Sequence, residues 1–159
     1  MITQSRLQQC LNYDPLTGIF TWKEIRRGLR TGDKAGCTRA KGYIAIRVDD
    51  KLYFAHRLAW FYVNGVWPKH CIDHINGIPD DNRIANLRDV EVRVNQENFR
   101  KARKNNLSGF LGVTTDKNRF SAKIQVNKKS IYLGSFKTPE QAHEKYLQAK
   151  RLLHEGCCI

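Results

Sequence analysis

Two residues that could do chemistry stand side by side at the end of a short apolar run, Asp73 and His74. A polar, turn-rich segment follows them and leads to Asn86 and then to Asn95. Carboxylate and amide oxygens suit Mg²⁺ or Mn²⁺, whereas Zn²⁺ is usually held by cysteine and histidine. A neutral histidine can accept a proton from water near neutral pH. The set predicts that Asp73 and Asn95 hold a divalent metal ion beside a general base, His74.

Hydrolysis of a phosphodiester bond is the reaction that suits such a site. It needs a nucleophilic water, charge relief on the phosphate and stabilisation of the leaving 3′ oxygen. One divalent cation supplies the last two, and a neutral histidine takes the proton of the water. Neighbouring side chains on a strand face opposite ways, so Asp73 and His74 can address one phosphate only if the strand ends or twists there. The turn residues 75–77 indicate such an end, and Asn86 would either brace the following loop or orient His74.

A simpler interpretation competes with this one. Alone, the Asp-His pair is more typical of a capped turn with a surface histidine, and His56 is more typical of a packing or capping residue. The longer pattern favours chemistry, because I-D-H-I-N-G is followed by D-N-R-I-A-N-L-R and then by N-x-x-N in a helical segment.

The elements before the site are expected to form its scaffold. Residues 3–12 predict a helix capped by Thr3, residues 14–18 a turn, residues 19–22 a strand, residues 42–48 and 52–55 a hairpin, and residues 56–64 a mostly buried helix. Residues 23–36 predict a basic loop, either solvated or close to phosphate, with Arg26, Arg27, Arg30 and Lys34.

The site itself is expected on two strands and a helix. Residues 70–74 and 87–90 predict the strands, the polar loop 76–86 lies between them, and residues 91–103 predict the helix. Val92, Asn95 and Phe99 would then share a face that packs back on the strands. A buried amide without a partner costs stability, and a metal ion would be such a partner for Asn95.

The periodicity changes beyond residue 103, where residues 104–108 predict a linker. Three antiparallel strands, polar on one face, are predicted at residues 110–115, 120–126 and 131–133. Thr138 then caps a helix that covers the apolar face of this sheet and ends at Gly156. The predicted fold class is α+β, with one domain at residues 1–103 (motif core 56–103) and a second, smaller domain at residues 109–159.

The charge of the chain favours a polyanionic partner. Among 159 residues, 28 Lys and Arg outnumber 15 Asp and Glu, which gives a net charge of +13 and a pI near 9.8. Residues 100–130 alone contain nine basic residues and one acidic residue. A β-ribbon can enter the major groove of duplex DNA, where Lys123 and Gln125 can read base edges while the turn lysines, Lys128 and Lys129, grip phosphate. Each single lysine is also compatible with a solvated surface.

Targeting and cysteine patterns favour the cytoplasm. No stretch approaches the roughly 20 apolar residues that span a bilayer, and the N-terminal residues lack the apolar core of a signal peptide. The five cysteines form no C-x-x-C pair, so neither a disulfide framework nor a cysteine-rich zinc site is indicated. We therefore expect a cytoplasmic protein with no membrane partner.

Residues 56–98 resemble HNH endonucleases of the phage and intron-encoded type, which have a ββα-metal fold. The resemblance rests on the motif pattern above and on two upstream strings, Y-D-P-L-T-G-x-F-T-W and H-R-L-A-W. It implies that His74 is the general base, that Asp73 and Asn95 hold one Mg²⁺ or Mn²⁺ ion, and that Asn86 is a structural and orienting residue. Glu91 departs from the family, because serine or threonine is the more usual cap at that position.

Residues 108–155 resemble an AP2-type DNA-binding domain through the blocks S-G-F-L-G-V and Y-L-G-S-F-K-T. In that family the polar face of a three-stranded sheet lies in the major groove of DNA. The resemblance implies that the same face here carries the contact residues, which are Thr114, Arg119, Lys123, Gln125, Ser130 and Tyr132. Several arginine and tryptophan contacts of the plant domains are replaced, so the base preference does not carry over.

The two resemblances together imply a metal-dependent, homing-endonuclease-like enzyme that cuts duplex DNA at a site chosen by its AP2-like domain. One site in a monomer would nick, and a double-strand break needs a dimer or a second binding event, so we expect a monomer or weak dimer with no obligatory protein partner. A phage-encoded protein would work on DNA in the cytoplasm of a bacterial host. The alternative is a sequence-specific DNA-binding regulator with an inactive HNH module. An RNA-binding protein is less favoured, because stacking residues beyond Tyr132 are lacking.

Overall fold

A computed structural model describes residues 1–25, 28 and 30–159, so Arg26 and Arg27 of the predicted basic loop lie outside the described residues. The chain forms two compact units, Met1–Glu91 and Val92–Ile159. Their boundary precedes the expected end of the first domain at residue 103. A helix suited to crossing a bilayer is absent from the part of the chain that the structure describes.

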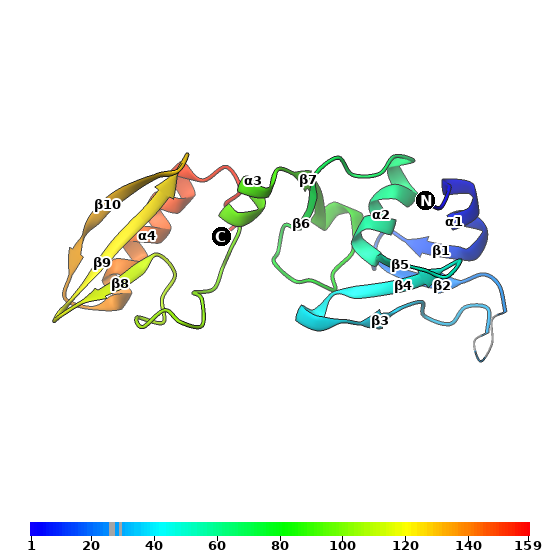
Figure 1. Ribbon diagram of the computed structural model, residues 1–159, viewed down its shortest axis with the longest axis horizontal. Coiled ribbons are helices and arrows are strands. Elements are labelled where there is room, and N and C mark those ends of the chain that lie inside the picture. The colour runs from blue at the N-terminus through cyan, green and yellow to red at the C-terminus, as the bar shows by residue number, and fades with distance from the viewer. Residues whose placement is uncertain (26–27, 29) are drawn as a thin grey trace. The chain divides into compact units, whose positions relative to one another are not determined.

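The described residues of the first unit form two α-helices and three small antiparallel sheets (Figure 1). The sheets pair β1 with β2, β4 with both β3 and β5, and β6 with β7. The elements are α1 (Gln4–Cys10), β1 (Leu11–Asp14), β2 (Ile19–Trp22), β3 (Cys37–Thr38), η1 (Ala40–Gly42), β4 (Ile44–Val48), β5 (Lys51–Phe54), α2 (Ala55–Asn64), β6 (Cys71–His74), η2 (Ile84–Asn86) and β7 (Leu87–Val90). The mixed α+β class is confirmed.

Local side-chain chemistry explains where the first elements begin and end. The Thr3 side chain accepts a hydrogen bond from the Arg6 amide and caps α1, as the sequence predicts. The helix ends at Cys10 rather than at residue 12, because Leu11 pairs with Trp22 in the β1–β2 hairpin. In the turn of that hairpin the Asp14 carboxylate accepts from the Leu16 amide, and Gly18 supplies a φ of +73°.

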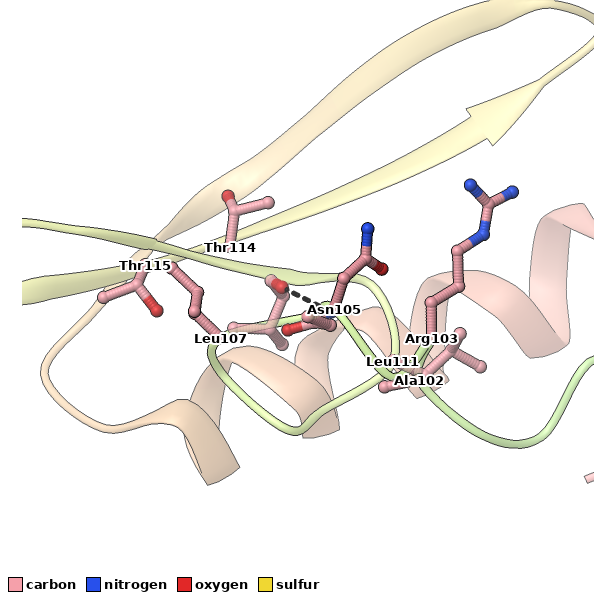
Figure 2. A pocket seen from close by; sticks show the side chains of 9 residues that line it. Ala102, Arg103, Asn105, Leu107, Leu111, Thr114 and Thr115 are labelled. Carbon is pink, nitrogen blue, oxygen red and sulfur yellow. Dashed lines mark hydrogen bonds between the residues drawn. The ribbon is translucent and has the colours of Figure 1, made fainter.

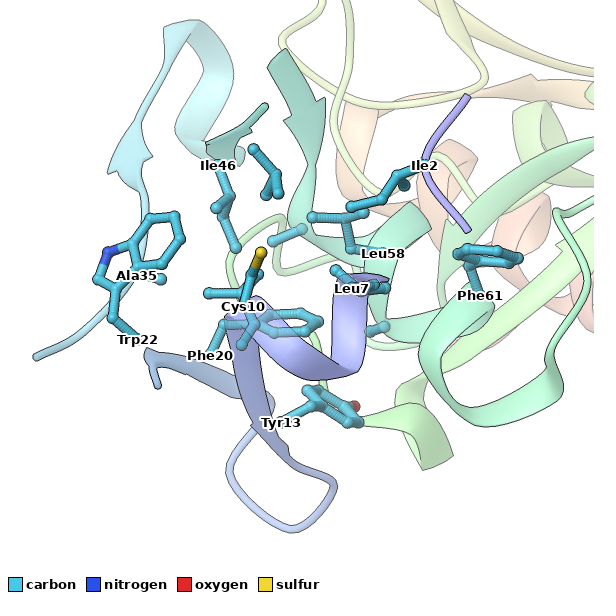
Figure 3. Close-up of a cluster of buried hydrophobic side chains, with 14 of the residues drawn as sticks. Ile2, Leu7, Cys10, Tyr13, Phe20, Trp22, Ala35, Ile46, Leu58 and Phe61 are labelled. Carbon is cyan, nitrogen blue, oxygen red and sulfur yellow. The ribbon is translucent and has the colours of Figure 1, made fainter. Parts of the chain in front are cut away.

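One hydrophobic core holds the first unit together. Figure 3 shows side chains of α1, the β1–β2 hairpin, β4 and α2 converging on it. Leu7, Cys10, Leu11, Ile46 and Leu58 have no exposed surface. The N-terminal hairpin and α2 are therefore parts of the same packed body as the strands that carry Asp73 and His74, since Ile72 and Leu87 belong to this core as well.

Truncation in this core tests its role. Leu58→Ala is expected to lower the free energy of unfolding by about 2–5 kcal/mol, because it removes buried methyl groups and leaves a cavity. All three tryptophans, Trp22, Trp60 and Trp67, lie in the first unit, so denaturant melts followed by tryptophan fluorescence report on it selectively. The control Leu16→Ala, at a position that is 83% exposed, should change the free energy by less than about 0.5 kcal/mol. Equal effects of the two substitutions would contradict this description of the core.

The second unit contains the elements α3 (Val92–Glu97), β8 (Val113–Asp116), β9 (Arg119–Val126), β10 (Lys129–Phe136) and α4 (Pro139–Leu153). The strands form an antiparallel meander in the order β10-β9-β8, and Figure 1 shows α4 along one face of it. Ala122 and Ile124 of β9 pack with Ala142, Tyr146 and Ala149 of α4 in a second core. The predicted meander, its covering helix and the cap by Thr138 are present.

The helix predicted at residues 91–103 is wrong in length, because α3 ends at Glu97. The carbonyl oxygen of Phe99 accepts a hydrogen bond from Lys150 Nζ, where a continued helix would offer it to the amide of residue 103. The expected apolar face is also wrong, since Val92 and Phe99 are more than half exposed. Instead, the buried Glu97 carboxylate joins α3 to the C-terminal residues by accepting from the Gly156 amide at 3.0 Å.

Candidate functional site

Asp73 lies on β6 directly opposite Arg88 of β7. The Arg88 guanidinium donates to Asp73 Oδ2 from both Nε (2.9 Å) and Nη2 (2.7 Å). The Asp73 side chain is only 6% exposed, so this charge-assisted pair holds a buried carboxylate in one orientation. Arg88 was not foreseen from the sequence, although its place opposite an aspartate across two short strands was a usable signal.

His74 is the last residue of β6, and the turn that follows is closed by a hydrogen bond from the Gly77 amide to the His74 carbonyl. The strand β6 therefore ends at His74. The sequence predicts this end, because Asp73 and His74 can address one phosphate only if the strand ends or twists there. The His74 ring is buried between the rings of Tyr43, at 5.9 Å, and His56, at 5.2 Å. Burial lowers the pKa of His74, while Asn82 and the carboxylate of Asp73 oppose that shift. The imidazole is thus neutral at pH 7, as a general base must be.

Asn86 braces the loop that joins the two strands. Its Oδ1 atom accepts from the Asn76 amide at 2.9 Å, and its Nδ2 group donates to Asn76 Oδ1 at 3.0 Å and to the Asp81 carbonyl at 2.8 Å. The Asp81 carboxylate in turn accepts from Asn76 Nδ2 and pairs with Arg83. Of the two roles that the sequence leaves open for Asn86, these contacts provide the bracing one.

Asn82 lies within hydrogen-bonding distance of the His74 imidazole. Its Oδ1 atom lies 3.3 Å from His74 Nε2, and the asparagine is 2% exposed. Sequence reasoning missed Asn82 as a site residue, although it lies eight residues after His74 within the D-N-R-I-A-N-L-R string.

His56 is a second buried histidine beside the first. It is 9% exposed, its ring stacks on Phe54 at 5.5 Å, and its Nδ1 atom has no hydrogen-bond partner among the described residues. Burial, with the nearby His74 and Arg57, lowers the pKa of His56 to about 3. A buried nitrogen without a hydrogen-bond partner lowers the stability of the fold, and His56 lies next to the candidate base His74.

Acid should destabilise the first unit through His56. The unfolded chain takes up a proton near pH 6.5, whereas the folded His56 resists protonation until about pH 3, so the free energy of unfolding falls as pH falls through this window. Between pH 7 and pH 4.5 the loss due to this group is about 2–3 kcal/mol.

Urea melts of the wild type and His56→Phe, followed by tryptophan fluorescence at both pH values, measure this loss. Between pH 7 and pH 4.5, the free energy of unfolding of His56→Phe should fall by about 2–3 kcal/mol less than that of the wild type. His70→Phe, at an exposed position, is the matched control and should behave as the wild type does. A His56→Phe protein with an unchanged pH dependence would contradict the assignment.

The first unit supplies only part of the predicted ligand set for a divalent metal ion. The Asp73 carboxylate is an oxygen ligand of the kind that Mg²⁺ prefers, and Mg²⁺ keeps several of its waters. The described residues contain no group of three His, Cys, Asp or Glu side chains that could hold a metal ion. Asn95, the second predicted ligand, lies on α3 in the second unit, and its part in metal binding stays a prediction.

The polar face of the β8–β10 sheet gathers the predicted DNA-contact residues of the second unit. In register, Thr114 lies opposite Ser121, Lys123 opposite Tyr132, and Gln125 opposite Ser130. Paired residues share a face of the sheet, and this face is opposite the one that α4 covers. Arg119 donates to the hydroxyl and carbonyl oxygens of Ser135, which keeps its guanidinium over the sheet. The predicted residues on the β9–β10 turn, Lys128 and Lys129, are exposed.

A groove of about 450 Å³ borders this face at the edge strand β8. Figure 2 shows Arg103, Asn105 and Thr114 extending in one direction from its walls. The rest of the lining is mixed, with the apolar residues Ala102, Leu107, Leu111 and Val113 and the polar residues Asn106 and Thr115. Arg103 and Asn105 were assigned to the domain end and the linker by the sequence, yet here they extend the polar surface past β8.

Residues 53–97 match a family model described as HNH endonuclease. The matched segment contains the β6–β7 hairpin with Asp73, His74, Asn82 and Asn86, and it indicates a nuclease that acts on DNA. No curated protein and no solved structure matches the chain significantly.

Proposed function

We propose that this protein is a metal-dependent, homing-endonuclease-like enzyme that hydrolyses phosphodiester bonds in duplex DNA. The observation that carries the proposal is a neutral, buried histidine next to a buried aspartate at the end of β6, inside the segment that matches HNH endonucleases. Histidine next to a carboxylate also occurs in structural hairpins, but burial lowers the pKa of His74 and so favours the neutral imidazole, the form that can accept a proton.

Four residues of the chain have proposed roles in this hydrolysis. His74 would take the proton from the attacking water, and Asp73 and Asn95 are the residues that would hold a Mg²⁺ or Mn²⁺ ion. The ion would supply charge relief on the phosphate and on the leaving 3′ oxygen. Asn86 maintains the loop in which these groups sit, through its bonds to Asn76 and Asp81.

The second unit is proposed to choose the cutting site in the manner of an AP2-type domain. An exposed sheet face with Lys123, Gln125 and Tyr132 can enter a major groove, and Lys128 and Lys129 at the turn can contact phosphate. Arg103, which lines the same groove as Thr114, would extend the phosphate contacts past the edge of the sheet.

Loss of the base should abolish most cleavage without loss of binding. His74→Ala is expected to slow the conversion of supercoiled plasmid to nicked plasmid by about 10²–10⁴-fold in Mg²⁺. DNA affinity, measured by fluorescence anisotropy in Ca²⁺, should stay within a few fold. The control His70→Ala removes an exposed histidine of the same unit and should retain the wild-type rate. Cleavage by His74→Ala at the wild-type rate would refute the role of His74.

Phosphate contacts by the second unit should appear in the salt dependence of binding. Lys128→Ala is expected to make the slope of log K against log[salt] shallower by about 0.9, because one released counterion is lost. Lys145→Ala, an exposed position on the helix that covers the opposite side of the sheet, should leave the slope unchanged. If both variants alter the slope equally, the polar face is not the DNA surface.

One observation favours a second candidate, a sequence-specific DNA-binding regulator with an inactive HNH module. The Asp73 carboxylate is already paired with Arg88, which competes with a metal ion for it. Specific binding with no cleavage in Mg²⁺, Mn²⁺ or Ca²⁺ would favour this candidate over the nuclease.

A further inference from the structure

The orientation of the Asn82 side chain determines which nitrogen of His74 carries the proton. The Nδ2 group of Asn82 faces the Asp80 carbonyl oxygen at 3.2 Å, and a carbonyl oxygen can only accept. The amide oxygen Oδ1 must therefore face His74 Nε2. Because Oδ1 can only accept as well, Nε2 must donate, and the lone pair of the neutral imidazole is then on Nδ1.

The backbone of Asn82 is held by a part of the chain far away in sequence. The Tyr13 hydroxyl, on β1, donates to the Asn82 carbonyl oxygen at 2.8 Å in a buried hydrogen bond. Burial raises the pKa of Tyr13 to about 12, so the hydroxyl remains a donor at every working pH. The Tyr13 ring is itself fixed by Phe20 at 4.8 Å and Tyr62 at 5.6 Å.

The turn between β1 and β2 approaches the same residue from another side. A Cβ atom added at Gly18 would lie 2.4 Å from the Arg83 nitrogen and 2.5 Å from the Asn82 carbonyl carbon, which no side chain tolerates. Gly18 also has a φ of +73°. Only glycine permits this approach, so the hairpin closes directly on the Asn82–Arg83 peptide.

We propose that the β1–β2 hairpin is a positioning element of the nuclease site: through Tyr13 and Gly18 it fixes Asn82, whose amide oxygen holds His74 in the tautomer with the proton on Nε2. This inference rests on the proposed function. It makes Nδ1 the nitrogen that takes the proton of the water, and it makes Asn82 and Tyr13 positioning residues that act through His74.

The tautomer can be measured without cleavage. Long-range ¹H–¹⁵N correlation spectra of the metal-free full chain at pH 7.5 distinguish the protonated ring nitrogen from the other one. The chain has five histidines, so His74→Ala identifies the signals of His74 by their loss. We expect the wild-type His74 to carry its proton on Nε2. In Asn82→Leu, which removes the acceptor at similar size, we expect a mixture of tautomers.

Plasmid nicking by the same proteins tests the consequence for catalysis. Asn82→Leu should lower kcat about 10- to 100-fold, the loss typical when a partner that orients a functional histidine is removed, with KM changed little. Tyr13→Phe keeps the ring but removes the hydroxyl that holds the Asn82 backbone. It should shift the tautomer ratio and kcat in the same direction as Asn82→Leu does, but by a smaller amount. Tyr62→Phe removes a hydroxyl from the adjacent ring and is the matched control, expected to behave as the wild type does.

Two results would overturn the inference: a wild-type His74 with its proton on Nδ1, or Asn82→Leu and Tyr13→Phe proteins with unchanged tautomer and kcat. Failure of the proposed function looks different, because the wild type would then cleave no DNA in any metal. In that case the spectra alone decide whether Asn82 fixes the histidine.

Discussion

The hydrogen bonds that polar loop residues make to one another are the interaction on which the candidate site depends. The segment between β6 and β7 contains three asparagines, two aspartates and one arginine, and several of these side chains bond to one another. Asn76, Asp81 and Asn86 are joined by hydrogen bonds of 2.7–3.0 Å. A network that is completely satisfied in this way is stiff, whereas a broken one leaves several buried groups unpaired.

The stiffness of the loop matters because the reaction needs a neutral histidine in one orientation. Burial by Tyr43 and His56 keeps His74 uncharged, and Asn82 faces one of its nitrogens. The same burial leaves His56 Nδ1 without a partner among the described residues. Enzymes commonly contain residues near a reactive group that lower the stability of the fold, because the requirements of activity and stability differ.

Most of the local structure was predictable, because its signals are short in range. The Thr3 and Thr138 caps, the turn at Gly18 and the alternating strands of the second unit follow from a few neighbouring side chains. The end of α3 was not predictable, since it depends on Lys150, 51 residues away from Phe99. Asn82 was missed for a similar reason: its role comes from a contact to a histidine and from the support of Tyr13, 69 residues earlier. Periodicity carries no information on such pairs.

The ends that the protein leaves on DNA test the central claim most directly. In the proposed reaction, the 3′ oxygen is the leaving group and His74 activates the attacking water. Plasmid nicked by the wild type in Mg²⁺ should therefore carry a 3′ hydroxyl and a 5′ phosphate, and DNA ligase alone should restore the closed circle. Nicks that ligase cannot seal, or sealable nicks formed equally fast by His74→Ala, would contradict the account.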